Sequence, residues 1–192
     1  MTNTSQIFKS LYMFFALLAG IFLVGFSAVL FITSDPRLNP AWSWGFLVGG
    51  LVLLYSCHYT RLHTKRKVNN IIAQFSHEGF KPTSGYEIDK SNIGRYFGID
   101  TEHGTILLVS VFDKIYKGLT VSDLAGYECK GSVITLKLKD IKFPYFVVNA
   151  GSESKSMDFC LKLDVLFTSS YKPKSHINHD FSEFVEKKSF AL

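Results

Sequence analysis

Two long segments without a charged residue dominate the N-terminal third of the chain. They cover residues 11–32 and 41–59. At a rise of about 1.5 Å per helical residue, each segment can cross a hydrocarbon core of about 30 Å. Lipid offers no hydrogen-bonding partner, so the backbone polar groups of such a segment must pair within a helix. The pattern therefore predicts a transmembrane helical hairpin over residues 1–60.

The hydrophobic pattern becomes amphipathic directly after this hairpin. Val68, Ile71, Ile72 and Phe75 follow the i, i+3, i+4, i+7 spacing of one helical face. This spacing predicts a juxtamembrane amphipathic helix within residues 61–78. Its apolar stripe lies either on the bilayer surface or on the domain that follows. We favour the domain, because the stripe is narrow and the segment leads straight into strands.

The next part of the chain contains short runs of β-branched and aromatic residues separated by turns. The runs predicted to form strands are residues 95–99, 105–111, 115–119, 126–130, 133–139 and 143–148. Leu136 and Leu138 alternate with Lys137 and Lys139, which predicts a sheet with one solvated face. Residues 100–104 end in a glycine and predict a tight hairpin turn between the first two runs.

A helix is predicted after the last strand. Ser152 is an N-cap residue at the start of the segment. Met157, Cys160, Leu161 and Val165 then form one apolar stripe, and we expect this helix to be mostly buried against the strands. The stripe is widened by Phe159, Leu163 and Leu166.

These elements define an α+β membrane protein, in which a two-helix transmembrane hairpin precedes a domain of strands and one closing helix. Segments 96–109 and 119–124, together with the closing helix 152–167, resemble a small bacterial pleckstrin-homology-like (PH-like) domain. The resemblance implies that residues 79–168 form a cytoplasmic, bent antiparallel sheet of six or seven strands plus a C-terminal helix. The C-terminal tail, residues 169–192, either folds on a partner or frays.

The chain has a formal net charge of +5, and much of the excess positive charge lies next to the hairpin. Arg61, Lys65, Arg66 and Lys67 follow the second uncharged segment. Basic residues remain on the cytoplasmic side of a membrane, so this cluster predicts a multi-pass protein of the bacterial inner (cell) membrane with both termini in the cytoplasm. The same four residues are a candidate contact with anionic membrane lipid.

The three cysteines show no paired spacing in the sequence. Cys57 ends the second uncharged segment, Cys129 lies in a predicted strand and Cys160 in the predicted closing helix. Without a C-x-x-C pattern or a dense cysteine framework, we expect free thiols in a reducing compartment.

Small residues one helical turn apart occur in both halves of the hairpin. They are Ala16 and Gly20 in the first segment and Gly45 and Gly49 in the second. Such pairs allow two helix backbones to approach closely in lipid. They serve either to pack the two helices of one chain or to form a homodimer face.

The sequence contains no recognisable pattern of catalytic residues. There is no G-x-S-x-G nucleophile motif and no phosphate-binding loop. Residues 176–180 contain two histidines and an aspartate, but no further zinc ligand lies nearby. Lys137, Lys139 and Lys142 lack the interleaved aromatic residues that stack on nucleic-acid bases. We therefore predict no enzyme, cofactor, metal or nucleic-acid partner.

The layout, a short membrane hairpin followed by a cytoplasmic domain, is similar to that of entry-exclusion proteins of conjugative plasmids. The similarity implies a membrane-anchored module that binds a protein partner in a membrane complex. Lys137 and Lys139 form the candidate partner face because the strand pattern exposes them. The alternative is a lipid-sensing PH-like module, although residues 81–92 mix acidic residues with lysines instead of forming a basic bowl. An enzyme is the least favoured alternative.

Overall fold

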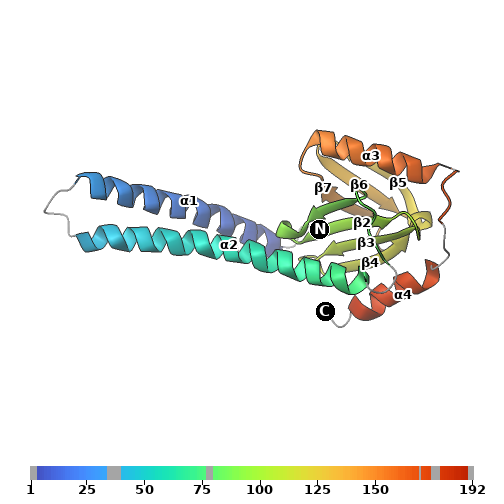
Figure 1. Ribbon diagram of the computed structural model, residues 1–192, viewed down its shortest axis with the longest axis horizontal. Helices are drawn as coiled ribbons and strands as arrows, with labels where there is room; N and C mark the ends of the chain where they lie inside the picture. The colour runs from blue at the N-terminus through green and yellow to red at the C-terminus, as the bar shows by residue number, and fades with distance from the viewer. Residues whose placement is uncertain (1–3, 34–39, 77–79, 169, 174–177, 190–192) are drawn as a thin grey trace. The chain divides into compact units, whose positions relative to one another are not determined.

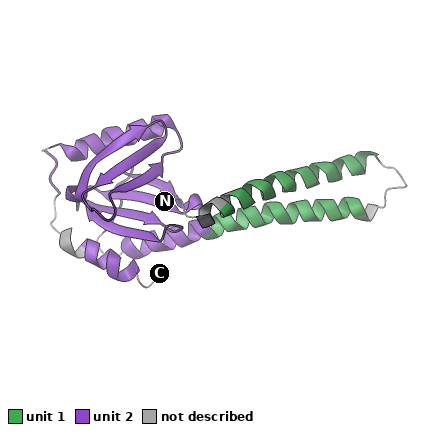
Figure 2. Ribbon diagram, turned by 180° about the vertical axis from the view of Figure 1, so that it is seen from behind, with its two compact units in different colours: residues 1–63 green, residues 64–192 purple. Residues whose placement is uncertain are grey.

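The chain forms two compact units, Met1–His63 and Thr64–Leu192 (Figure 2). The computed structural model describes residues 4–33, 40–76, 80–168, 170–173 and 178–189. The loop between the two predicted transmembrane segments lies outside these residues. Figure 1 labels the helices and strands of both units.

The first unit consists of two antiparallel helices. Helix α1 is Thr4–Thr33, and helix α2 is Pro40–Ser76, of which the residues up to His63 belong to this unit. Helix α2 has no break after residue 59, so the predicted amphipathic segment is a continuation of the same helix.

Two side-chain contacts define the register between the helices. The Ser27 hydroxyl donates to the Ser43 carbonyl oxygen at 2.9 Å, and the Cys57 thiol lies 3.8 Å from the Met13 carbonyl oxygen. Ser27 and Ser43 are both buried, and this hydrogen bond gives the Ser27 hydroxyl the partner that a polar group needs in an apolar surrounding. The two contacts lie at opposite ends of one continuous seam of small residues.

The centre of this seam is a glycine pair. A Cβ at Gly20 would lie 3.2 Å from the Gly50 carbonyl oxygen, and a Cβ at Gly50 would lie 2.9 Å from the Gly20 carbonyl oxygen. Ala16, one turn from Gly20, is also buried. At Gly45 and Gly49 a Cβ would have no other atom within 4 Å. The seam on α2 is therefore built on Gly50 instead of the predicted Gly45 and Gly49.

Large apolar side chains cover the outside of this helical pair. Phe22 and Trp42 are each 68% exposed and Val52 is 60% exposed. Within the described residues, one helical segment, Leu11–Thr33, is long and apolar enough to cross a membrane, with a mean hydropathy of 2.6. This finding rests on length and composition alone.

In the described part of the second unit, seven antiparallel strands form two sheets. The first sheet, in the order β1-β2-β3-β4, consists of Glu87–Lys90, Arg95–Asp100, Thr105–Ser110 and Ile115–Thr120. The second, in the order β5-β6-β7, consists of Leu124–Lys130, Val133–Leu138 and Tyr145–Asn149. Short 3-10 helices, η1 (Ser91–Ile93) and η2 (Val121–Asp123), precede β2 and β5. The six predicted strands match within two residues, but β1 was missed because Glu-Ile-Asp-Lys contains a single apolar residue.

The two sheets and helix α3 (Glu153–Phe167) enclose the larger hydrophobic core. Phe97 of β2 contacts Phe159 of α3 edge to face, with ring centroids 5.2 Å apart. Leu136 and Leu163 are fully buried in the same core. The predicted cap of α3 is confirmed, since the Ser152 side chain accepts a hydrogen bond from the backbone at position 155.

Helix α3 buries only one side of the wide apolar stripe that we predicted, the side with Phe159, Leu163 and Leu166. Met157, Leu161 and Val165 are 67%, 63% and 55% exposed, so their predicted burial is wrong. The buried residues are Ser156, Phe159, Cys160, Leu163 and Leu166. Apolar residues lie on both sides of this helix, and the sheet packs against the side that carries Phe159.

A second hydrophobic core lies on the opposite face of the first sheet. Val68, Ile71 and Phe75, from the end of α2, are at most 1% exposed there. Helix α4 (Asn178–Ser189) adds Phe181 and Val185 to the same core. The amphipathic stripe of α2 therefore packs on the domain, and the part of the tail that forms α4 is an integral element of it.

Cys129 of β5 and Cys160 of α3 form a disulfide, and Cys57 is free and buried. The prediction of free thiols is therefore wrong for this pair. The two cysteines are 31 positions apart in the sequence. Only the packing of α3 against β5 brings them together, so no local spacing could have indicated the bond.

Candidate functional site

The structure shows no candidate metal centre among the residues that it describes. No group of three or more His, Cys, Asp or Glu side chains gathers closely enough there to hold an ion. Residues 176–180, the weak zinc candidate of the sequence, fall outside the part of the chain whose side chains are described.

The most buried carboxylate, Asp100, stabilises a turn. It is 1% exposed and accepts hydrogen bonds from the backbone N–H groups of Lys81, Glu102 and His103, at 3.0, 2.9 and 3.1 Å. The His103 ring lies 2.7 Å from its second oxygen. Burial opposes the charge of this carboxyl, but these hydrogen bonds outweigh it and hold the pKa of Asp100 below its usual range. With its lone pairs occupied in this way, Asp100 is a structural residue.

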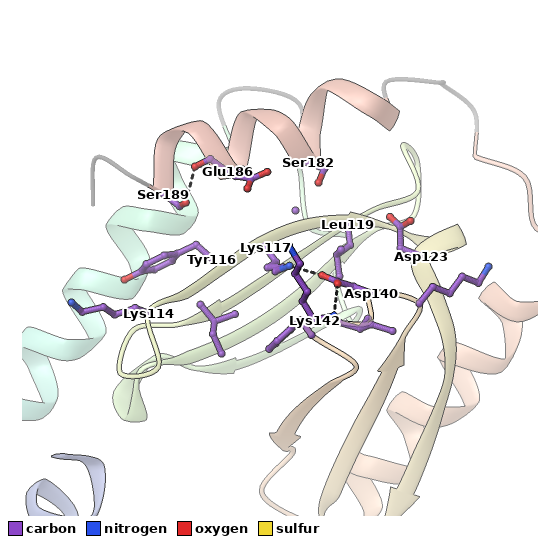
Figure 3. Close-up of a pocket in the computed structure, with 15 residues that line it drawn as sticks. Lys114, Tyr116, Lys117, Leu119, Asp123, Asp140, Lys142, Ser182, Glu186 and Ser189 are labelled. Atoms are coloured by element: carbon purple, nitrogen blue, oxygen red, sulfur yellow. Dashed lines mark hydrogen bonds and ion pairs between the residues drawn. The ribbon is translucent and has the colours of Figure 1, made fainter. Parts of the chain in front are cut away.

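The candidate site is an open groove of about 690 Å³ beside strand β4 (Figure 3). One side is β4 itself with Lys114 before it, and the opposite side is the β6–β7 connection, residues 138–143. Helix α4 forms a third wall through Ser182, Glu186 and Ser189. Its volume is in the range of about 300–1,000 Å³ that is usual for ligand pockets.

One ion pair lies inside the groove. The Lys117 ammonium donates to Asp140 at 2.7 Å, and the backbone N–H of Lys142 donates to the other oxygen of Asp140 at 2.9 Å. The bond from Lys117, together with that from Lys142, holds the pKa of Asp140 below its usual range. Lys117 also lies 5.4 Å from the centre of the Phe143 ring. The positive charge of Lys117 and the negative charge of Asp140 therefore cancel within the groove.

The groove is lined by four lysines and by the carboxylates of Asp123, Asp140 and Glu186, which leaves its lining a net charge of +1. Lys114, Lys139 and Lys142 line it, and none of the three forms an ion pair within the described part of the chain. The Asp123 carboxylate caps η2 through the Thr120 N–H at 2.7 Å and the Thr120 hydroxyl at 2.8 Å. The groove thus offers three unpaired ammonium groups to a ligand.

The structure separates the two predicted partner-face lysines. Lys137 lies on β6, where its ammonium group is 3.4 Å from Glu128 of β5. Lys139 follows the end of β6 and lines the groove. The predicted stripe of two lysines is therefore split between an ion pair on the sheet surface and the groove.

The predicted lipid-contact cluster is exposed along helix α2. Arg61, Lys65, Arg66 and Lys67 are all exposed, whereas Val68 is fully buried. This pattern leaves the four basic side chains accessible, and their contact with lipid stays a prediction.

Most of the groove could not be found by sequence reasoning. Lys114, Tyr116 and Lys117 belong to β4 and the turn before it, and they join the β6–β7 connection only through the fold. The wall provided by α4 comes from a helix more than 50 positions farther along the chain. The one local indication was the alternation that exposed Lys139.

The structure therefore defines a class: an α+β protein with an N-terminal apolar helix, a sheet domain closed by helices, and an open groove lined by charged residues. The profile of the exclusion-determining protein family matches residues 3–167. The match covers most of the chain, and the chain belongs to this family. No curated protein sequence matches it. This match confirms the suspected relation to entry-exclusion proteins. It ends at residue 167, before helix α4 begins.

Proposed function

We propose that this protein is a membrane-anchored interaction module that acts in entry exclusion by binding a protein of a membrane complex. The observation that carries the proposal is the family match, which extends through both helices of the first unit and both sheets of the second. The open groove beside β4 supports a binding role. No catalytic motif was found in the sequence, and the proposal assigns the protein no reaction.

The anchor in this proposal is a hairpin in which both α1 and the first part of α2 cross the bacterial inner membrane. The exposed aromatic and aliphatic side chains of the pair support it, because water-exposed patches of this kind are rare in soluble proteins. A seam of Gly, Ala and Ser is the packing that lipid favours between helices. The basic cluster from Arg61 to Lys67 supports an orientation with both termini in the cytoplasm.

The domain in this proposal is PH-like. Four antiparallel strands, three further strands and a helix that closes the core support this assignment. In addition, the end of α2 and helix α4 cover the outer face of the first sheet. Fold likeness alone does not determine what the domain binds.

A mating experiment tests the proposed function. The related plasmid in this test is a conjugative plasmid that itself encodes a protein of this exclusion family. Recipient cells that express the full chain should receive it less often than recipients carrying the empty vector. Transfer of a plasmid from an unrelated group serves as the control and should be unchanged. Equal transfer of the related plasmid into both recipients, with the protein present in the membrane, would contradict the proposal.

The disulfide provides a separate test of the cytoplasmic placement. Disulfides are rare in the bacterial cytoplasm, so the Cys129–Cys160 bond opposes the placement that the basic cluster favours. If the domain is cytoplasmic, alkylation at the moment of cell lysis should trap both cysteines as thiols. If they are instead trapped as a disulfide in growing cells, the domain lies in an oxidising compartment and the predicted orientation is wrong. A Cys57→Ser background keeps the third thiol out of the measurement.

A further inference from the structure

Helix α4 packs on the outer face of the first sheet through one apolar side (Figure 1). Phe181 stacks on Phe80, with ring centroids 5.6 Å apart. Phe184 meets the Phe75 ring edge to face, with centroids 5.9 Å apart. Val185 is fully buried in the same core. The three apolar residues of α4 follow the i, i+3, i+4 spacing with which an amphipathic helix binds an apolar surface.

The strand beneath α4 has a glycine at the point of closest approach. A Cβ at Gly118 of β4 would lie 2.8 Å from a Val185 methyl carbon and 3.0 Å from the Phe181 ring. A glycine at this position therefore lets a helix come closer to the sheet than any other residue would. The name α4-binding face is used below for the surface formed by Phe75, Phe80 and Gly118.

The α4-binding face belongs to the part of the chain that the family profile matches. The profile covers residues 3–167, which include Phe75, Phe80 and Gly118 and exclude α4. The larger core, between the two sheets and α3, contains no residue of α4 within the described part of the chain. The face is thus a feature of the family region, and the helix that lies on it comes from outside that region.

The contacts that hold α4 on this face are of a kind that another helix can supply. The ring contacts are apolar, and two polar contacts lie within α4 itself. Lys187 pairs with Glu183 at 2.6 Å, and the Ser189 hydroxyl donates to the Glu186 carbonyl oxygen at 2.7 Å. Helix α4 has 12 residues, and a helix shorter than about 12–15 residues is marginal in water unless it is docked. Its stability as a helix therefore depends on the face.

We propose that the α4-binding face is the docking site for an amphipathic helix of a protein partner, and that α4 occupies this site as an intramolecular competitor. The inference rests on the proposed function and names the partner segment, a helix with large apolar residues at positions i, i+3 and i+4. In the structure α4 completes the second core, so the partner helix takes its place instead of adding to it. Ser182 and Glu186 of α4 also line the groove beside β4, so the exchange changes that lining as well.

Peptide binding to the purified full chain in detergent tests the exchange. The probe is a fluorescein-labelled peptide with the sequence of Asn178–Ser189. The attached α4 competes with this peptide, so a substitution that weakens only the attached helix should strengthen peptide binding. Phe181→Ala in the chain leaves the face intact and should therefore bind the peptide at least tenfold more tightly than the native chain does. Fluorescence anisotropy measures the affinities.

A matched pair of variants loosens α4 without removing any of its buried side chains. Glu183 is exposed, and glycine destabilises an exposed helical position relative to alanine. Glu183→Gly should therefore bind the peptide about fivefold more tightly than Glu183→Ala. Both variants lose the ion pair with Lys187, so the comparison isolates the stability of the attached helix.

Three further measurements show where the peptide binds and whether α4 opens. A peptide that carries Phe181→Ala and Val185→Ala should not bind. A benzophenone at the Phe184 position of the peptide should cross-link to the end of α2 around Phe75, because these rings are neighbours in the structure. In the native chain, amide hydrogen exchange should show that α4 opens at a lower urea concentration than β3 does.

Any of four results would overturn the proposal. They are the absence of peptide binding to every chain, equal binding to Glu183→Gly and Glu183→Ala, a cross-link away from the α4-binding face, and exchange of α4 only together with β3. The last result would make α4 a permanent part of the core.

Mating at graded expression keeps the two proposals distinct. If α4 competes with a partner helix, Glu183→Gly should exclude the related plasmid at a lower amount of protein in the membrane than Glu183→Ala. A purely structural α4 gives the reverse order, because the looser domain is then the less stable one. Peptide exchange with equal or reversed exclusion refutes the inference and leaves the proposed function standing. Peptide exchange without exclusion by any chain, the native one included, leaves the docking face standing and refutes the proposed function.

Discussion

The two compact units of this chain are packed by opposite kinds of side chain. In the first unit, small residues such as Gly20, Gly50 and Ser27 lie between the helices, and large residues such as Phe22 lie outside. In the second unit, Phe97 and other large residues fill two cores, and polar residues lie mostly outside.

This difference supports the proposal that the first unit lies in lipid and the second in water. Water drives large apolar side chains inward, and the second unit follows this rule on both faces of its first sheet. Lipid supplies no such drive, so helices in it pack by close approach of small residues, as the first unit does. The comparison predicts that removing volume harms the second unit, whereas adding volume harms the first.

The largest effect is expected for Phe181→Ala in the second unit. Phe181 is 2% exposed and stacks on Phe80, with ring centroids 5.6 Å apart. Truncation of such a side chain costs about 3–5 kcal/mol of unfolding free energy. Urea unfolding of the full chain in detergent, followed by circular dichroism, measures the loss.

The control for this prediction is Glu183→Ala on the exposed side of the same helix. Its unfolding midpoint should equal that of the native chain. If Phe181→Ala also unfolds at the native midpoint, α4 does not belong to the core, and the second core is limited to the end of α2.

The next effect compares two leucines of α3. Leu163 is fully buried and Leu161 is 63% exposed. Leu163→Ala should cost about 2–5 kcal/mol, whereas Leu161→Ala should stay within about 0.5 kcal/mol of the native chain. The same urea titration measures both. A larger loss for Leu161→Ala than for Leu163→Ala would restore the face that the sequence pattern favoured.

This pair of leucines shows where sequence reasoning about the fold succeeds and fails. Strands such as 133–138 were found because their alternation is local. The predicted stripe of α3 was too wide because Met157 and Phe159 are both apolar, and only the sheet decides which side is buried. Packing of the α2 stripe on the domain was favoured from the sequence, but its contact partner was not found because Phe75 and Phe181 lie more than 100 positions apart.

The candidate site was predictable only in part, for a related reason. The exposed position of Lys139 followed from the strand pattern, whereas Lys137 was assigned to the same face although it pairs with Glu128. Lys114 lies at the turn before β4, and nothing in the sequence places it opposite Lys142. A groove formed by three separate elements is a property of tertiary packing.

The first unit allows the converse test, in which volume is added. A Cβ at Gly50 would lie 2.8 Å from a Val24 methyl group and 2.9 Å from the Gly20 carbonyl oxygen, but a Cβ at Gly49 would contact nothing. Gly50→Leu should therefore weaken the helix pair by about 1–3 kcal/mol, the usual cost of overpacking. Both tryptophans, Trp42 and Trp44, lie in this unit, so their fluorescence during an SDS titration measures the separation of the helices.

Gly49→Leu is the matched control, and it also tests the open homodimer hypothesis. It should leave the separation of the two helices unchanged. If Gly45 and Gly49 form a homodimer face, the same substitution should reduce chemical cross-linking between chains. Equal sensitivity of the helix pair to both substitutions would contradict the seam seen in the structure.

The smallest effect concerns how the second unit accommodates a buried charge. The buried polar groups described in the helical pair, such as Ser27, are uncharged, whereas the second unit buries the Asp100 carboxylate among three backbone N–H donors and the His103 ring. Asp100→Asn keeps one oxygen acceptor but loses the charge, so we expect a cost of about 1–2 kcal/mol at neutral pH.

The pH dependence of this cost distinguishes the charge from the shape of the side chain. An aspartate in the unfolded chain titrates near pH 3.9, and the pKa of Asp100 in the folded protein is lower. The stability that the charge contributes is therefore fully present above about pH 3.9 and is lost as the pH falls through the folded pKa. The difference between the native chain and Asp100→Asn should shrink over that acidic interval, as urea unfolding at a series of pH values would show. Asp158→Asn, at an exposed carboxylate on α3, should have little effect at any pH. A cost for Asp100→Asn that stays constant into acid would mean that the turn depends on the shape of the side chain and not on its charge.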